Sequence, residues 1–496
     1  MSKNLGDLSG RKGIQNNLFD KLGNYAKQTG TVETKKLDEL AEEFLYGKAN
    51  LWGTTTFYDF LKPENKGKKA YICNGSACLC ADTQQNVQTK LEQHFKASEI
   101  GHMTCLGRCH ENSAFHYAGH NYSGNSVENL EDILAKKVIF EDKYHIKSLG
   151  HAVLTQKRSF EYHQKVIQKV LTQSPEITLE EIKKSNLRGR GGAGFPMGFK
   201  LESCKNETST TKFVICNADE GDPGAYSDRY LLEKQPFAVL SGMIAAAFVI
   251  GAEWSIVYLR AEYPEAVQIV QKAIDKLEKK GLLGDNIQGS GFSHRIKIIQ
   301  AQGAYICGEE TALINSIEGQ RPEVRTRPPY PTQEGLFNKP TVVNNVETLA
   351  VLPFVITQGG SVYAAMGTEK SKGTKLITLD SNFKNPGCYE VEMGVSLSQV
   401  INELGGGFKH SVKALQVGGP LGGILPVHKI DELSIDFESF SQNDFLLGHG
   451  SIVGIPQDFP MIKYLEHLLE FAAYESCGKC FPCRLGTKRG QELITK

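Results

Sequence analysis

Three cysteines near the C-terminal end of the sequence have the spacing of iron–sulfur ligands. Cys477, Cys480 and Cys483 form a C-x2-C-x2-C motif. This spacing lets one short loop aim three thiolates at one centre, as a [4Fe–4S] cluster requires. No cysteine follows Cys483 in the sequence, so the motif lacks a fourth ligand. The motif predicts electron transfer at a cluster site that something else must complete.

Four further cysteines form two pairs in the first quarter of the sequence, Cys73-x4-Cys78 and Cys105-x3-Cys109. Two cysteine pairs on two loops of one small domain suit a [2Fe–2S] cluster, in which each loop serves the irons. Zinc is the alternative, although zinc sites usually have pairs separated by two residues. Cys80 is a fifth thiol nearby and could be a bystander.

A glycine-rich segment in the middle of the sequence predicts phosphate binding. Its glycines let backbone N–H groups approach a ligand closely, and an arginine and a lysine add positive charge. Its spacing matches neither the dinucleotide fingerprint nor the P-loop. A phenylalanine beside it could stack on a planar ring, and a tight structural turn is the alternative. The residues are Gly189, Arg190, Gly191, Gly192, Gly194, Phe195 and Lys200.

Polar residues follow predicted strands and helix starts in three further motifs. One motif directly follows a predicted strand, where ligands bind in open α/β sheets; a solvated turn is its alternative. A second opens a predicted helix, where its carboxylates could simply cap the helix. A third offers paired amides that could read the edge of a heterocycle. The candidate residues are Asn217, Asp219 and Asp222 in the first, Tyr305, Gly308, Glu309 and Glu310 in the second, and Asn344 and Asn345 in the third.

Together these motifs resemble the flavin-bearing NADH dehydrogenase subunit of respiratory complex I and its soluble relatives. The resemblance covers residues 187–486 and follows the family's motif order. The first 145 residues resemble the thioredoxin-like [2Fe–2S] subunit that accompanies it. The fusion of the two is most similar to the large diaphorase subunit of soluble NAD-linked hydrogenases and to the flavin subunit of NAD-dependent formate dehydrogenases. The matching segments are Leu-Arg-Gly-Arg-Gly-Gly-Ala-Gly-Phe, Cys-Asn-Ala-Asp-Glu-Gly-Asp-Pro-Gly, Gly-Ala-Tyr-Ile-Cys-Gly-Glu-Glu-Thr-Ala-Leu, Val-Asn-Asn-Val-Glu-Thr and Glu-Ser-Cys-Gly-Lys-Cys-Phe-Pro-Cys-Arg.

The resemblance implies a set of cofactors and roles. FMN would be held by the glycine loop, Lys200 and the polar motifs, and NAD(H) would stack on the flavin and Phe195, with Asp222 and Glu310 nearby. The family more often has glutamate in place of Asp222, which has the shorter side chain. Hydride would pass directly between nicotinamide and flavin, so no protein acid or base is expected to be catalytic. The family's fourth [4Fe–4S] cysteine would lie beyond Lys496, so the sequence is truncated, a neighbouring polypeptide supplies the ligand, or the cluster is altered.

The alternation of strand-like and helix-like segments predicts an α/β multidomain protein. Strands are expected at 213–216, 255–259 and 296–300, and the apolar stretch Phe237–Ala252 is expected to be a buried helix, slightly short for a bilayer span. The resemblance implies a thioredoxin-like domain, a Rossmann-like FMN/NAD domain, a small ubiquitin-like (SLBB-type) α+β module and a C-terminal helical bundle. The expected boundaries are 1–65 for an N-terminal helical segment, 66–148 for the [2Fe–2S] domain, 149–365 for the FMN/NAD(H) domain, 366–450 for the ubiquitin-like module and 451–496 for an incomplete [4Fe–4S] domain.

Composition excludes several other classes of protein. The 496 residues contain 56 Lys+Arg and 56 Asp+Glu, and this zero net charge argues against a nucleic-acid partner. The start lacks the apolar core of a signal peptide, and a large chain whose 12 cysteines fall mostly in tight groups is expected to be cytoplasmic.

The expected function is that of an NAD(H):acceptor oxidoreductase (diaphorase) subunit in a soluble multisubunit complex. Its expected partners are an iron–sulfur electron-transfer subunit and a hydrogenase, formate dehydrogenase or other reductase module. The alternatives are a complex I NADH-quinone oxidoreductase subunit, a non-catalytic iron–sulfur relay or scaffold, and a zinc-binding nucleic-acid or regulatory protein.

Overall fold

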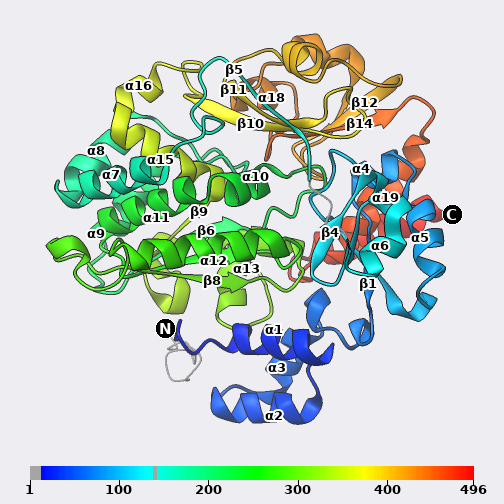
Figure 1. Ribbon diagram of the computed structural model, residues 1–496, viewed down its shortest axis with the longest axis horizontal. Helices are drawn as coiled ribbons and strands as arrows, with labels where there is room; N and C mark the ends of the chain where they lie inside the picture. The colour runs from blue at the N-terminus through cyan, green and yellow to red at the C-terminus, as the bar shows by residue number, and fades with distance from the viewer. Residues whose placement is uncertain (1–12, 138–141) are drawn as a thin grey trace.

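The computed structural model describes residues 13–137 and 142–496 (Figure 1). At its centre lies a four-stranded, fully parallel sheet with the order β8-β7-β6-β9. Three of these strands are the ones predicted from the sequence, and the fourth comes after them in the chain. The strands are β6 (Phe213–Ala218), β7 (Trp254–Leu259), β8 (Arg295–Gln300) and β9 (Thr341–Asn345).

Both faces of this sheet are buried, which explains why its strands read as continuous apolar runs. Side chains alternate along each strand. Phe213 and Ile215 pack with the N-terminal helices and α13, while Val214 and Cys216 pack with α11 and α15 on the other face. The helices of this region are α7 (Phe160–Leu171), α8 (Pro175–Lys184), α9 (Met197–Asn206), α10 (Ser227–Lys234), α11 (Pro236–Ile250), α12 (Pro264–Lys279), α13 (Glu310–Ile317), α14 (Pro331–Glu334), α15 (Val346–Gln358) and α16 (Gly360–Ala364).

The N-terminal segment is helical, as predicted. The Asn17 side chain caps α1 by accepting from the backbone N–H of Asp20 at 3.1 Å, and Gly30, with φ of 81°, ends the helix. The Asn17 amide also donates to the carbonyl of Ile317 at the end of α13. This segment therefore covers one face of the central sheet rather than standing apart. Its helices are α1 (Leu18–Thr29), α2 (Thr34–Glu43) and α3 (Lys48–Thr55).

The next region has a small sheet with the order β2-β1-β3-β4, in which β1 pairs parallel with β2 and antiparallel with β3. This is the strand–helix–strand plus hairpin arrangement expected of a thioredoxin-like domain. Its own apolar cluster, which includes Ile72, Leu91 and Phe115, lies behind the sheet. The elements are β1 (Ala70–Cys73), α4 (Ser76–Cys80), α5 (Gln84–Glu92), β2 (Ile100–Met103), β3 (Phe115–Tyr117), β4 (His120–Tyr122) and α6 (Leu130–Leu134).

A third sheet is larger than the predicted 366–450 module. It has six strands in the order β13-β12-β14-β10-β11-β5 and takes up β5 and β14, which lie outside that range. Long-range pairing of this kind leaves no local pattern in the sequence, so the predicted domain boundaries stay a prediction. The elements are β5 (His145–Leu149), β10 (Thr374–Leu379), β11 (Gly387–Glu392), α17 (Leu397–Gln399), a π-helical turn at Val400–Leu404, β12 (Val412–Val417), β13 (Ile424–Pro426), α18 (Phe437–Gln442) and β14 (Ser451–Pro456).

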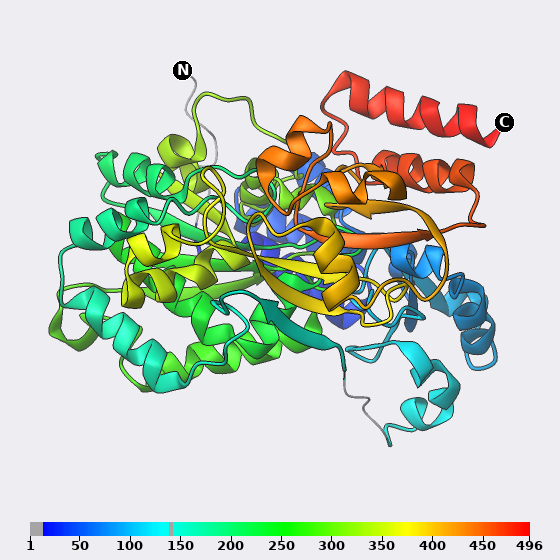
Figure 2. The same ribbon diagram turned by 90° about the horizontal axis from the view of Figure 1, so that it is seen from above.

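Two helices, α19 (Met461–Tyr474) and α20 (Phe481–Thr495), end the chain and lie side by side (Figure 2). Their outer faces carry exposed apolar side chains, of which Phe481 is 75% exposed.

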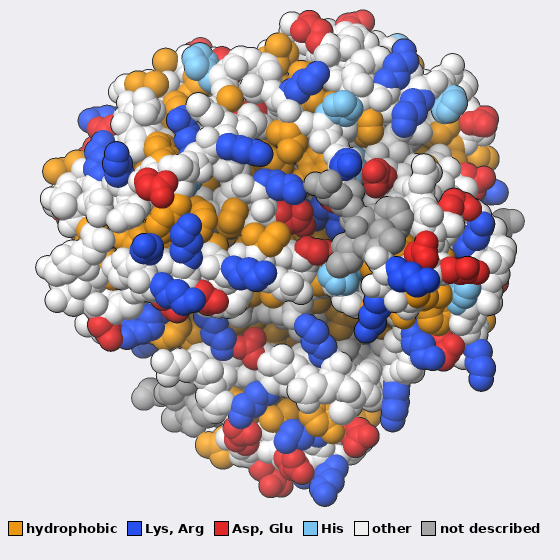
Figure 3. Space-filling view, viewed as in Figure 1, with side chains coloured by type: hydrophobic (Ala, Val, Ile, Leu, Met, Phe, Trp, Pro, Cys, Tyr) orange, Lys and Arg blue, Asp and Glu red, His pale blue; other side chains and the backbone are white. Residues whose placement is uncertain are grey.

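No single helix among the described residues is long and apolar enough to cross a membrane. The pair α10 and α11, bent by 95°, is long and apolar enough when the two helices are taken together, by length and composition alone. On the face in Figure 3, acidic and basic side chains are interspersed.

Candidate functional site

The predicted polar motifs meet at one end of the central sheet. Because β6 and β9 are parallel neighbours, with Asn217 opposite Asn345, the segments that leave these strands lie next to each other. The Asn217 amide donates to the carbonyl of Gly308 at 2.8 Å, which brings the third motif to the same place. The site therefore lies at the carboxyl ends of parallel strands, where ligands bind in open α/β sheets.

The glycine loop lies against this sheet edge. The Gly189 N–H donates to the Phe195 carbonyl at 2.8 Å, which closes the loop on itself. Gly192 and Gly194 have φ of 117° and 60°, a region that disfavours other residues. A Cβ on Gly191 would lie 3.1 Å from the Asn345 Cβ. The loop thus leaves bare backbone at the surface that faces the ends of β6 and β9.

Arg190 has a structural role that the sequence did not predict. Its side chain is fully buried and donates to the Tyr363 hydroxyl at 2.9 Å and to the carbonyl of Lys372. Its backbone N–H donates to the Thr348 hydroxyl. These bonds use the arginine to anchor the glycine loop to α15 and to the loop before β10. A contact between this guanidinium and a phosphate group stays a prediction, because its Nε and Nη1 are buried and have no hydrogen-bond partner among the described residues.

Lys200 lies at the same sheet edge. Its ammonium donates to the Val343 carbonyl at 3.0 Å and to the Glu310 carboxylate at 3.1 Å. Arg327 lies on the other side of Glu310, at 3.5 Å. Since these contacts are partly exposed, an anionic ligand can compete for both cations.

Two of the predicted ligand residues are helix caps. The Glu309 carboxylate accepts from the N–H groups of Thr311 and Ala312, each at 2.9 Å, and so caps α13. The Asn345 side chain accepts from the Glu347 N–H at 2.8 Å and so caps α15. The capping alternative is therefore the correct local interpretation for Glu309. Both residues still border the site.

Aromatic and acidic side chains line the approach to the loop. Phe195 is 48% exposed and meets Phe199 edge-on, with ring centroids 5.8 Å apart. The Tyr305 hydroxyl donates to Asp222 at 2.7 Å. Burial raises the pKa of both Asp219 and Asp222. An exposed ring beside a glycine loop offers a stacking surface, and the two carboxyls offer hydrogen bonds.

The residues present fit a phosphate-bearing planar cofactor such as FMN. The glycine backbone is bare, the N-terminus of α15 lies at the same edge, and Lys200 supplies a positive charge. The Asn344 amide nitrogen is buried and has no hydrogen-bond partner among the described residues. A buried donor without a partner costs about 1–3 kcal/mol, which a ligand acceptor would remove.

The four N-terminal cysteines converge in a buried pocket. Cys105 and Cys109 have their sulfurs 3.7 Å apart, and the Cys73 thiol interacts with those of Cys78 and Cys105. Backbone N–H groups of Gly75 and Gly107 donate to two of the sulfurs. Hydrogen bonds from Cys109 and Cys73 hold the pKa of the Cys105 thiol well below its usual range. Four crowded sulfurs with N–H donors fit an iron–sulfur cluster.

Cys80 does not belong to this group. It lies on the far side of the short helix α4, near Asp380 and Tyr464, and burial raises the pKa of its thiol. The bystander role expected for it agrees with this position.

The C-terminal cysteines lie on one turn at the start of α20. Cys477 is 8% exposed, whereas Cys480 and Cys483 are exposed. The Ser476 hydroxyl is 3.3 Å from the Cys483 sulfur. No other cysteine lies on this turn, so the three ligands fit a [4Fe–4S] cluster that takes a further ligand from elsewhere.

A buried carboxylate, which the sequence did not single out, joins the three sites. Glu475 lies two residues before Cys477. Its carboxylate accepts from the hydroxyl of Thr104, the neighbour of Cys105, at 3.2 Å and from the Tyr305 N–H at 2.8 Å. A polar cavity of about 10 Å³ between them, the size of one water, is lined by residues of all three regions. Burial raises the pKa of Glu475 to about 7. The three predicted cofactor sites therefore share one polar junction.

Sequence reasoning also missed a buried group behind the glycine loop, formed by Glu220, Asp228 and His449. Glu220 lies within a motif that was recognised, but His449 comes from a distant turn with no spacing signal.

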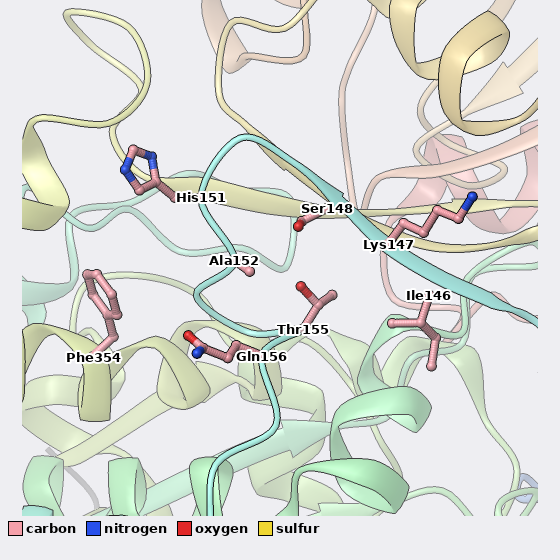
Figure 4. Close-up of a pocket in the computed structure, with 8 residues that line it drawn as sticks. All are labelled: Ile146, Lys147, Ser148, His151, Ala152, Thr155, Gln156 and Phe354. Carbon is pink, nitrogen blue, oxygen red and sulfur yellow. The ribbon is translucent and has the colours of Figure 1, made fainter.

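A separate hollow of about 560 Å³ lies between β5 and α15 (Figure 4). Its lining contains none of the predicted site residues, and it groups no side chains that suggest chemistry.

Comparison with known proteins agrees with this geometry. Residues 8–137 match a family described as thioredoxin-like [2Fe-2S] ferredoxin, 182–353 the Nuo51 FMN-binding domain, and 463–496 the NADH-ubiquinone oxidoreductase-F iron-sulfur binding region. The fold and the three sites define a flavin- and iron–sulfur-dependent oxidoreductase.

Relatives and a solved structure extend the match. The NADP-reducing hydrogenase subunit HndC of Solidesulfovibrio fructosivorans is 45% identical over 66% of this chain and 67% of its own. The F 2 subunit of the NADH-quinone oxidoreductase of Rhizobium meliloti is 40% identical over 68% of this chain and 80% of its own. A crystal structure of an NAD+-reducing [NiFe]-hydrogenase in the air-oxidized state matches with a TM-score of 0.83 and 29% identity, over 96% of this chain and 84% of that chain.

The chain belongs to the family of flavin-bearing NADH dehydrogenase subunits. It is an NAD(H) oxidoreductase subunit whose cofactors are FMN, a [4Fe–4S] cluster and a [2Fe–2S] cluster. The predicted family, fold class and cofactors are confirmed.

Proposed function

We propose that this subunit passes electrons between NAD(H) and a hydrogenase module in a cytoplasmic multisubunit complex. What supports this is the combination of the flavin and [2Fe–2S] regions in one chain, together with the match to an NAD+-reducing hydrogenase over 96% of the chain. Formate dehydrogenase, another reductase and complex I are the other acceptors that the family allows. Interspersed surface charges give no support to a nucleic-acid partner.

The proposed flavin site is the sheet edge built by the glycine loop and the two strand ends. Bare backbone at Gly189, Gly191, Gly192 and Gly194 would approach the cofactor, Lys200 would neutralise its phosphate, and Asn344 would donate its free amide. When bound, FMN supplies the conversion between a two-electron hydride and single electrons. The further residues assigned to this edge are Asn217, Asp219, Tyr305, Gly308, Glu309 and Asn345, while Arg190 keeps the loop in place.

NAD(H) is proposed to enter over the exposed side of the same loop. Phe195 would offer its ring for stacking, and Asp222 and Glu310 would bond ribose hydroxyls. The chain's task is orientation: a ring held in stacking geometry keeps the reacting atoms in line, and no side chain has to move a proton. The [4Fe–4S] ligands are Cys477, Cys480 and Cys483, with a further ligand from outside the turn, and the [2Fe–2S] ligands are Cys73, Cys78, Cys105 and Cys109.

A Phe195→Ala variant tests whether NAD(H) and FMN depend on different residues of the site. Loss of the stacking ring should raise the KM for NADH roughly tenfold, because an aromatic contact contributes about 1–1.5 kcal/mol. Bound FMN, measured by absorbance, should stay unchanged, because the loop backbone and Lys200 remain. Phe199→Ala, which removes the neighbouring exposed ring, is the matched control. Loss of FMN in Phe195→Ala would contradict the proposal.

A further inference from the structure

The His449 side chain lies buried between two carboxylates behind the proposed flavin site. Its Nε2 is 3.0 Å from Asp228 Oδ2, and its Nδ1 is 3.7 Å from Glu220 Oε1. The side chains of His449, Asp228 and Glu220 are 7%, 1% and 0% exposed. A buried imidazole that faces acids on both sides needs an explanation in terms of charge.

A metal ion is a poor explanation for this cluster. The Glu220 oxygens already accept four hydrogen bonds, which fill the four lone-pair sites of a carboxylate. The donors are the backbone N–H groups of Asp228 and Arg229, at 2.7 and 2.9 Å, and the hydroxyls of Ser227 and Tyr263, at 3.3 and 3.1 Å. Glu220 is therefore a helix cap for α10, with no lone pair left to bind a metal.

The hydrogen-bond pattern indicates that both ring nitrogens of His449 carry protons. Nε2 faces the Asp228 carboxylate, which can only accept. The Asn345 amide nitrogen is also 3.3 Å from Nε2, but it donates a hydrogen to Asp228 at 2.7 Å. Nδ1 faces the Ser227 hydroxyl at 3.3 Å, and that hydroxyl donates its hydrogen to Glu220. Burial opposes the charged form, but Asp228 and Glu220 outweigh it and raise the pKa of His449 to about 9. The ring is thus an imidazolium at neutral pH.

The turn that carries this cation, together with its partner Asp228, contacts both elements that would hold the cofactor. A Cβ on Gly192 would lie 3.3 Å from the backbone of Gly448, so the turn that carries His449 supports the glycine loop. Asp228 accepts from the Asn345 amide at 2.7 Å as well as from His449. The other charged groups that face His449 are Glu220 and Asp222 after β6, Asp228 on α10 and Lys375 on β10.

We propose that His449 is a positioning residue that holds a buried positive charge behind the flavin site and so favours the arrival of a hydride there. The inference rests on the flavin site proposed above. A hydride leaves NADH with its electron pair, NAD+ is formed, and the acceptor gains one negative charge, so no other reagent is needed. His449 opposes that negative charge, and through Asp228 it fixes the Asn345 amide that caps α15. Without it, the buried Asp228 carboxylate would keep only the Asn345 amide as a hydrogen-bond donor among the described residues.

The test measures an equilibrium of the purified flavin-containing protein rather than its turnover. The ratio of reduced to oxidised flavin is read from absorbance at fixed NADH/NAD+ ratios. In His449→Gln this ratio should fall at pH 7 by on the order of tenfold, as expected for one buried charge. His163→Gln is the matched control, because His163 is also buried but bonds Ser241 away from the site and has its pKa lowered by burial to about 4.

A pH series on the unmodified protein supplies a second, independent measurement. The ratio should show an extra fall as pH rises through about 9, where His449 loses its proton, and His449→Gln should lack this step. An unchanged ratio in a His449→Gln protein that retains FMN overturns the inference. So does the absence of the step near pH 9, which decides the matter if the variant does not fold. Flavin that NADH cannot reduce in the unmodified protein would instead contradict the proposed function.

Discussion

The two cysteine sites of this chain are built in opposite ways. The N-terminal thiols are at most 2% exposed and come from two loops that pack against the central region. The C-terminal thiols lie on a single turn, and two of the three are exposed. A cluster in the first site is part of the protein core, whereas a cluster in the second depends on whatever covers that turn. The four buried cysteines are Cys73, Cys78, Cys105 and Cys109, and the three of the turn are Cys477, Cys480 and Cys483.

The two sites are nevertheless mechanically linked. His467 of α19 has its Nε2 3.2 Å from the Ser76 hydroxyl at the start of α4, and Glu475 bonds Thr104 beside Cys105. The exposed turn therefore follows a helix that is fixed to the buried site. Two side-chain hydrogen bonds thus tie the region of the exposed turn to the buried site.

The largest expected effect is a difference in the free energy of unfolding between ligand variants of the two cysteine sites. Cys105→Ser removes a ligand from the buried pocket and should lower the free energy of unfolding by more than about 3 kcal/mol, because loss of a metal site is among the most destabilising changes. Cys480→Ser removes an exposed ligand and should change that free energy by less than about 0.5 kcal/mol. Urea unfolding of both variants, with iron counted per chain, checks this.

Both variants should lose iron, because each removes a ligand. A large loss of stability in Cys480→Ser would show that the exposed turn is a structural core of its own. The contrast between the two sites would then be false.

Some of this arrangement follows from local sequence and some does not. The strands β6, β7 and β8 and the glycine loop were predictable because apolar runs and glycine density are local signals. The inward turn of Arg190 was not, since it depends on Tyr363, far away in sequence. For the same reason no spacing pattern could bring β5 beside β11, His449 to Asp228, or Glu475 to Thr104. Ligand types were readable from the sequence, but the buried polar groups between the sites were not.

The pH dependence of stability tests the link between the two cysteine sites at His467. Burial lowers the pKa of His467 to about 4, against 6.5 in an unfolded chain. Since the unfolded state binds the proton more readily, His467 costs stability as pH falls from 6.5 through 4. The cost is on the order of 2–3 kcal/mol at pH 4. His467→Gln, which can still bond Ser76, should therefore lose less stability than the unmodified protein over this range in thermal unfolding scans.

His145, an exposed histidine on β5, gives the control variant His145→Gln, which should follow the unmodified protein. Equal acid sensitivity of the His467 variant and the unmodified protein would mean that the link carries no buried neutral histidine. The packing of α19 onto α4 would then need another explanation.

The smallest expected effect is that of replacing Cys80, a cysteine that is buried but is not a proposed ligand. Cys80 is 4% exposed and lies two residues from Cys78 on α4, so the two side chains point to different sides of the helix. Cys80→Ala should cost about 1 kcal/mol for the lost packing and leave the iron content and the [2Fe–2S] spectrum unchanged. Cys78→Ala, on the same helix, should lose the cluster. If Cys80→Ala also loses iron, Cys80 contributes to cluster binding, and the proposed set of four [2Fe–2S] ligands is wrong.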